Sequence, residues 1–222
     1  MSHLLLIDTA VNAASVALTS DKKILAQKEN TRQNDHAAWL QPAIQSLFEE
    51  TGISIGQLDA VGVTAGPGSY TGLRVGMAAA KGFCFAQNIP LISISTLQLL
   101  AAGVQEEATD LIIALIDARR DEVYAGVYDR DLRPVVEEQA MILGTDSFQS
   151  WREKNHVIYT GDGAAKIERL IGIKQFPLYT AKNLMGKLAG LTYEKFQRSE
   201  FSNLAYLEPT YLKEFHQAPK DK

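Results

Sequence analysis

The sequence predicts an α/β protein with two lobes, each formed by one copy of a βββαβα unit. Three observations lead to this prediction. Short apolar runs bounded by turn residues alternate with longer stretches of helical periodicity, and their order repeats along the chain. The first run of each copy ends in an aspartate that opens a hairpin, at Asp8 and at Asp117. With 222 residues and 46% hydrophobic content, the chain can build one large core or two small ones.

The first copy begins with three strands before any helix. A helix is then expected from Asp35, a suitable N-cap, to Gly52, a suitable stop. Pro42 lies inside this helix and predicts a kink or a break. The predicted strands of this copy lie at 4–9, 14–19, 24–29, 60–64 and 91–95, and its helices at 35–52, after Gly68 and at 96–102.

The second copy repeats this order after a polar, acidic stretch at 103–110. Its predicted strands lie at 111–117, 122–129, 135–142 and 156–160, with a helix near 147–154 and further helices to about 198. Such duplication is typical of the two-lobed, ribonuclease H-like fold of actin-like ATPases. We therefore expect a first lobe over 1–103 and a second over 104–202. The tail at 203–222 is too short to place from its pattern, and a return to the first lobe is one option.

The charge balance argues against a protein that binds nucleic acid by itself. The net charge is −4, whereas phosphate contacts need clustered Lys and Arg side chains. The single Cys84 excludes a disulfide framework and a thiolate zinc site, which fits a reducing compartment. The opening apolar run is interrupted by Asp8 too early for a signal peptide, and no apolar run reaches membrane-spanning length. The expectation is a cytoplasmic protein without a membrane anchor.

A glycine loop, Gly66-Pro67-Gly68, separates a buried strand from a helix rich in small residues. In that helix Gly72, Gly76 and Ala80 recur every four residues and form a ridge without large side chains. A loop of this kind before a helix N-terminus can bind an anion, but the full P-loop and dinucleotide motifs are absent. Close packing, within the chain or across a subunit boundary, is therefore the favoured interpretation of the ridge.

Loops that could be remnants of a nucleotide site occur in both copies. In an actin-like ATPase the two aspartate hairpins would hold phosphate or magnesium, and glycines would let the backbone approach. Neither hairpin contains a glycine, and a lone aspartate at a strand end is more often a turn residue. The arginines that follow the second aspartate are usually solvated but could meet a carboxylate or phosphate of a partner. The candidate residues for a degenerate nucleotide site are Asp8, Thr9, Asp117, Arg119, Gly161 and Gly163.

The four histidines, at positions 3, 36, 156 and 216, are scattered along the chain. No pair has the i, i+4 spacing that places two imidazoles on one helix face around a metal ion. The sequence therefore predicts neither a metal site nor another cofactor.

Three segments carry a resemblance to a known family: LLLIDTAVNAASVAL, GPGSYTGLRVGMAAAKGFCFAQNIPLISISTLQLLA and DARRDEVYAGVY. Together they resemble the TsaB (YeaZ) family of bacterial tRNA threonylcarbamoyladenosine biosynthesis proteins. The similarity is dense to about Tyr128, weaker afterwards, and visible again at Pro209-Thr210-Tyr211-Leu212. The sequence departs from the family at Ala10, where a serine is common, which argues further against a nucleotide role for that loop.

The resemblance implies a non-catalytic scaffold that dimerises with a catalytic subunit, TsaD, and stabilises it. TsaD transfers a threonylcarbamoyl group to the adenosine adjacent to the anticodon in tRNAs that read codons starting with A. An ATPase, TsaE, would dock on this pair, the scaffold would form a homodimer when alone, and tRNA would be met only through the complex. Two metal-binding histidines of TsaD match Thr96 and Leu100 here, which implies no catalytic residue in this chain.

The resemblance also places the pairing surface on the first two helices of the first lobe, where the small ridge would let a partner helix approach closely. The implied interface residues are His36, Leu40, Ile44, Gly72, Leu73, Arg74, Gly76, Met77, Ala80 and Lys81. Two enzymatic alternatives remain open at this point. One is an actin-like ATP-dependent enzyme that uses Asp8 and Asp117, and the other is a metallopeptidase-like protein with its own active site. A free-standing RNA-binding module is disfavoured by the acidic balance.

Overall fold

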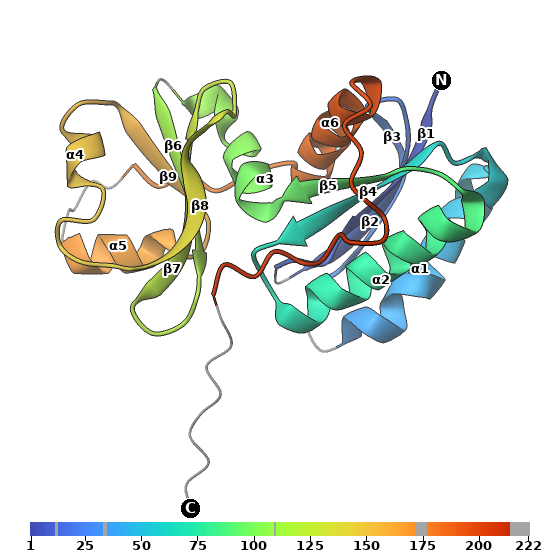
Figure 1. The fold of residues 1–222 in the computed structure, drawn as a ribbon, viewed down its shortest axis with the longest axis horizontal. Helices are drawn as coiled ribbons and strands as arrows, with labels where there is room; N and C mark the ends of the chain where they lie inside the picture. Colours follow the sequence, from blue (N-terminus) through green and yellow to red (C-terminus); the bar gives the residue numbers. More distant parts are fainter. Residues whose placement is uncertain (12, 33–34, 109, 172–176, 214–222) are drawn as a thin grey trace, which may run out of the picture.

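The computed structural model describes residues 1–11, 13–32, 35–108, 110–171 and 177–213, which form two lobes (Figure 1). The first lobe is centred on a five-stranded sheet with the strand order β3-β2-β1-β4-β5. The second lobe is centred on a four-stranded sheet with the order β8-β7-β6-β9. The strands are β1 (His3–Asp8), β2 (Ala14–Ser20), β3 (Lys23–Asn30), β4 (Ala60–Gly66), β5 (Leu91–Ser95), β6 (Leu111–Asp117), β7 (Glu122–Asp129), β8 (Pro134–Ile142) and β9 (Val157–Thr160). The α-helices are α1 (His36–Thr51), α2 (Tyr70–Gln87), α3 (Thr96–Ala102), α4 (Gln149–Arg152), α5 (Ala164–Ile171) and α6 (Leu184–Gln197).

The two sheets repeat one pairing scheme. In the first lobe β1 pairs antiparallel with β2 and parallel with β4. In the second lobe β6 pairs antiparallel with β7 and parallel with β9. Asp8 and Asp117 are the last residues of β1 and β6, so they occupy equivalent positions. The predicted two-lobed, actin-like α/β fold is confirmed.

Helices α1 and α2 lie side by side and cover one face of the first sheet (Figure 1). Their apolar side chains join those of the strands in one core cluster, including Ile7, Val16, Leu40, Leu47, Val63 and Met77. The apolar stripe that helical periodicity predicts for each helix is therefore the face turned toward the sheet.

Of the kink or break predicted at Pro42, the break does not occur, because α1 continues through Pro42 to Thr51. Proline lacks the N–H that would bond the carbonyl of Ala38 four residues earlier. Both residues are exposed, so water can bind that carbonyl instead. Asp35 occupies the N-cap position without a capping hydrogen bond from its side chain, and Gly52 ends the helix at a φ of 69°.

Helix α6 covers the opposite face of the first sheet, which corrects the prediction that residues 104–202 belong to the second lobe. Met185, Leu188 and Ala189 of α6 pack against Leu4 and Leu6 of β1 in a separate core cluster. The outer face of this sheet is apolar and must be covered, but the sequence pattern of α6 does not specify which sheet it covers. Of the predicted tail, residues 203–211 run along the first lobe, residues 212–213 contact the second lobe, and residues 214–222 lie outside the described part of the chain.

Candidate functional site

The carboxyl ends of β1 and β4 meet at the first aspartate, Asp8, whose carboxylate is buried. Its Oδ1 accepts hydrogen bonds from the Thr64 hydroxyl at 2.8 Å and from the Ala10 amide at 3.1 Å. Burial raises the pKa of the Asp8 carboxyl, and the two hydrogen bonds, which favour the charged form, oppose this shift only in part. The side chain therefore links strand ends inside the fold and has no exposed face for a ligand.

Replacing Asp8 by asparagine is expected to raise the free energy of unfolding at pH 7, on the order of 1 kcal/mol, because a desolvated charge is removed while both hydrogen bonds can be kept. The folded-state pKa of Asp8 is raised, so the folded protein binds a proton more tightly than the unfolded chain does. The advantage of Asp8→Asn over the wild type should therefore shrink as the pH falls through the raised pKa. Urea unfolding at pH 7 and pH 4 tests this, and an advantage that grows with acidification would contradict it.

Thr9 explains two of the glycines of α2, Gly72 and Gly76. Its hydroxyl donates to the Gly72 carbonyl at 2.7 Å, in the interior of the protein. A Cβ added at Gly72 would lie 2.1 Å from the Thr9 carbonyl oxygen, and one added at Gly76 would lie 2.2 Å from the Thr9 hydroxyl oxygen. At Gly72 and Gly76 the ridge of small residues is thus filled by Thr9, which directly follows β1, and we correct the expectation that it receives a partner helix.

The second aspartate, Asp117, is held in a network of hydrogen bonds rather than buried. Its Oδ1 accepts from the Lys166 ammonium at 2.7 Å and from the Arg119 amide at 2.6 Å. Partial burial favours the neutral acid, but the hydrogen bonds and the positive charges of Lys166 and Arg119 outweigh it and lower the pKa of Asp117. Lys166 also donates to the backbone carbonyl of Glu122 at 2.9 Å. Through Lys166, the Asp117 carboxylate therefore fastens α5 to the β6–β7 hairpin.

The loop Gly161-Asp162-Gly163 follows β9 as Gly66-Pro67-Gly68 follows β4. Both glycine loops therefore stand after the strand that lies parallel to the aspartate-tipped strand. A Cβ added at Gly161, whose φ is 93°, would lie 2.1 Å from the Leu115 carbonyl oxygen of β6. Close packing on β6 thus requires a glycine at position 161, and Asp162 accepts a hydrogen bond from the Asp117 amide at 2.9 Å.

Most of the predicted interface residues are buried in the first lobe, which is a further correction. Their side chains form the inward stripes of α1 and α2 and cannot contact a partner while the lobe is folded: His36, Leu40, Ile44, Leu73, Met77 and Ala80. Arg74 and Lys81 reach the surface but bind the chain's own C-terminal segment, through the Tyr211 hydroxyl and the Leu207 carbonyl. The prediction selected the apolar face of each helix, and that face covers the sheet.

The side of α2 that points away from the sheet carries a different set of residues, which we call the outer stripe: Ala78, Gly82 and Phe85. Their spacing of four and three residues places them on one helix face. Phe85 is 82% exposed, the highest value for any phenylalanine in the described chain. A Cβ added at Gly82 would meet nothing within 4 Å, so the chain's own packing does not require a glycine there. The sequence feature that could have indicated this surface is Phe85, a large apolar side chain that lies off the buried face of the helix.

The described residues contain no group of three or more His, Cys, Asp or Glu side chains that could hold a metal ion. Thr96 and Leu100 lie buried in α3, and Leu100 packs against the second sheet. A hydroxyl and a branched alkyl group are not a donor set for zinc or iron. Within the same residues, no helix has the length and apolar character needed to cross a membrane.

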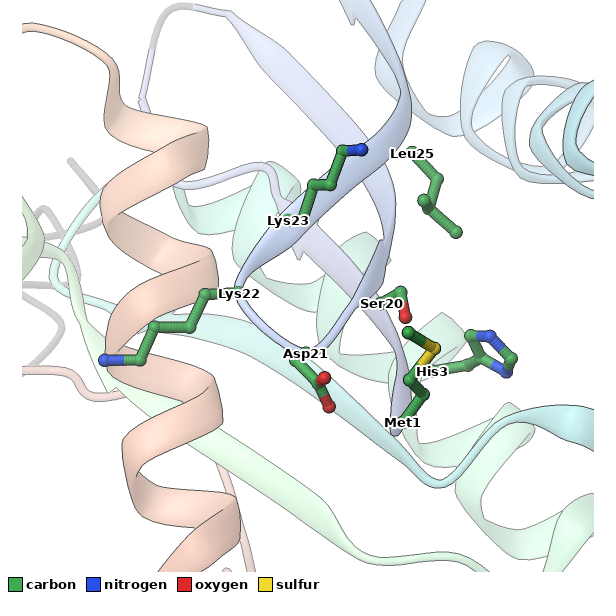
Figure 2. A pocket seen from close by; sticks show the side chains of 7 residues that line it. All are labelled: Met1, His3, Ser20, Asp21, Lys22, Lys23 and Leu25. Atoms are coloured by element: carbon green, nitrogen blue, oxygen red, sulfur yellow. The ribbon is translucent and has the colours of Figure 1, made fainter.

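A shallow hollow of about 610 Å³ lies at the β2–β3 turn (Figure 2). Its side chains spread in different directions rather than toward one point, as Figure 2 shows for Lys22, Lys23 and His3. Lys22 binds Glu194 of α6 at 2.8 Å. That ion pair connects the hairpin to α6, and the side chains that line the hollow do not assemble a reactive group.

Comparison with known proteins identifies the family. A family model described as TsaD, tRNA N6-adenosine threonylcarbamoyltransferase, matches residues 23–219. The tRNA threonylcarbamoyladenosine biosynthesis protein TsaB of Bacillus subtilis is 31% identical over 95% of this chain and 93% of its own length. The chain belongs to the TsaB family. TsaB of Escherichia coli is 36% identical over 58% of this chain, and the aligned part spans 56% of that relative's length.

The fold of this TsaB-family chain also matches a solved relative. YeaZ from Pseudomonas aeruginosa superimposes with a TM-score of 0.74 at 29% sequence identity, over 96% of this chain and 100% of that one. The agreement extends over both lobes.

Proposed function

We propose that this chain is the non-catalytic scaffold subunit of a tRNA threonylcarbamoyl transferase complex. In this role it takes part in threonylcarbamoyladenosine formation next to the anticodon, in tRNAs that read codons starting with A. Membership of the TsaB family supports the pathway. The structural engagement of Asp8 and Asp117 supports a scaffold rather than an ATP-dependent enzyme, since each carboxylate is already bound within its own lobe.

The partner in this proposal is a TsaD-like catalytic subunit, which docks on the outer stripe of α2 beside the exposed side of α1. The observation that carries the placement is the exposed pair of Gly82 and Phe85. Phe85 offers apolar area to a partner, and Gly82 lets a second backbone approach where no side chain of this chain intervenes. A TsaE-like ATPase would then bind the pair, and tRNA would be contacted through the complex. When the chain is alone, the same stripe would be the interface of a homodimer. The protein and its complex would be located in the cytoplasm.

Reconstitution tests this function. A TsaD-like subunit, a TsaE-like ATPase, threonylcarbamoyl-AMP and tRNA are combined with and without this chain, and the modified nucleoside is quantified by mass spectrometry. Modification should require the chain, and the chain alone should give none. Modification by the chain alone would contradict the proposal, as would full activity without it. ATP hydrolysis by the purified chain that Asp117→Asn abolishes would favour the enzymatic alternative.

A further inference from the structure

The C-terminal segment of residues 202–213, which we call the strap, leaves α6 and is attached along the first lobe. The Ser202 amide donates to the Leu91 carbonyl of the edge strand β5 at 2.8 Å. Lys81 of α2 donates to the Leu207 carbonyl at 3.0 Å, and the side chains of Leu204 and Leu207 pack against the core beneath. The strap therefore follows the surface of the first lobe toward the ends of its central strands.

At the end of β4 the strap is held by an aromatic and cationic cluster. The Thr210 amide donates to the Ala65 carbonyl at 2.7 Å. The Tyr211 hydroxyl accepts from the Arg74 guanidinium at 3.0 Å, and the Tyr211 ring lies 5.5 Å from the Tyr70 ring between centroids. The guanidinium carbon of Arg74 stands 3.8 Å from the centroid of the Tyr70 ring, within the range of a cation–π contact.

The strap then crosses to the second lobe (Figure 1). Leu212 packs against the core cluster between α3 and the second sheet. The Lys213 ammonium forms an ion pair with the Glu122 carboxylate of β7, and both side chains are half-buried. A hollow of about 310 Å³ lies where the strap faces the second lobe, and its lining includes Thr210 and Leu212 from the strap and Tyr128 and Glu138 from β7 and β8.

The covalent connections between the lobes lie together. The chain crosses after α3 and again before α6, and the Lys182 amide donates to the Gly103 carbonyl at 3.1 Å. A Cβ added at Gly103 would lie 2.7 Å from the Ala181 Cβ, so the two crossings touch. Two adjacent connections can act as a hinge, because one lobe can rotate relative to the other about them without stretching either segment. A contact away from the hinge is needed to fix the angle between the lobes.

We propose that the strap is an interlobe latch that holds the two lobes at a fixed angle. Two of its residues fasten it: Tyr211 binds the first lobe and Lys213 binds the second. This inference does not rest on the proposed function. Tyr211 fastens the strap to α2, and the next two residues reach β7 and the second core. Loss of both fastenings leaves the hinge, the packing of α3 and Leu212, and the hydrogen bond from Ser95 at the end of β5 to Glu138 of β8 as restraints.

The distance between the lobes tests the latch in the full-length chain. Spin labels are placed on exposed positions of each lobe, at Glu49→Cys on α1 and Glu168→Cys on α5. The native Cys84 can remain, because it is fully buried and burial raises the pKa of its thiol to about 12. Pulsed electron–electron double resonance then measures the distance distribution between the two labels, in the chain with the wild-type strap and in the double variant Tyr211→Ala/Lys213→Ala. The double variant should give a broader distribution shifted to longer distances.

Tyr206→Ala is the matched control. Tyr206 is also a strap tyrosine, but its side chain is 83% exposed, so its loss should leave the distance distribution unchanged. A double variant with the wild-type distribution would overturn the proposal, as would an equal shift in the control.

Hydrogen exchange gives a second readout that is independent of the labels. The Thr210 amide is bonded to Ala65, so it should exchange about tenfold faster in the double variant, whereas the amides of β6 keep their wild-type rates. Unchanged exchange at Thr210 would overturn the proposal. If the double variant does not fold, Lys213→Ala alone is compared, because it removes one ion pair and leaves the contacts of Tyr211 in place.

Discussion

Replacing Gly72 by alanine is expected to lower the free energy of unfolding by about 3 kcal/mol, because the new methyl group overlaps a backbone atom. Its Cβ would lie 2.1 Å from the carbonyl oxygen of Thr9, the residue that directly follows the central strand β1. A backbone carbonyl cannot rotate away as a flexible side chain can, so α2 or β1 must move. The gain in helix propensity from glycine to alanine, about 1 kcal/mol, offsets only part of this strain.

Gly82→Ala in the same helix is the control for this experiment. The added methyl group meets nothing within 4 Å, so only the propensity gain applies and stability should rise by about 1 kcal/mol. Urea unfolding followed by circular dichroism measures both variants. Equal midpoints for Gly72→Ala and Gly82→Ala would show that the contact between Thr9 and α2 does not constrain position 72.

Replacing Gly82 by leucine is expected to weaken binding to a TsaD-like subunit by about a hundredfold, close to 3 kcal/mol. The leucine side chain would stand on the outer stripe between Ala78 and Phe85, where the proposed partner helix approaches most closely. The isolated chain should fold at least as well as the wild type, because the site is open and leucine favours a helix more than glycine does. Isothermal titration calorimetry with the partner, together with a melting curve of the isolated chain, separates the two effects.

Gly190→Leu provides a matched control for binding. Gly190 lies in α6, which covers the opposite face of the first sheet, and a Cβ added there also meets nothing within 4 Å. The same substitution is therefore made in an open helical position away from the proposed interface. The placement of the interface is wrong if Gly82→Leu binds as tightly as Gly190→Leu. Gly76→Leu is unsuitable for this test, since it would collide with Thr9 and disturb the fold itself.

The outer stripe shows where sequence reasoning stopped short. The apolar faces of α1 and α2 pack on the sheet. The interface was predicted on the same faces, although a side chain such as Leu40 cannot fill the core and contact a partner at once. The residues of the outer stripe are less apolar as a set, and within it Phe85 stands out as a large, 82% exposed aromatic side chain.

The sequence by itself determined the duplicated strand order, the aspartate at the end of each first strand and the glycine loops, because period-two and period-3.6 patterns and turn residues are local properties of the chain. The tertiary structure alone decided which surface each segment covers. Helix α6 lies on the first sheet, the ridge of α2 receives Thr9, and the strap reaches Glu122. These contacts join residues far apart in the sequence. They depend on the shapes of two completed sheets, and the pattern of one segment does not contain that information.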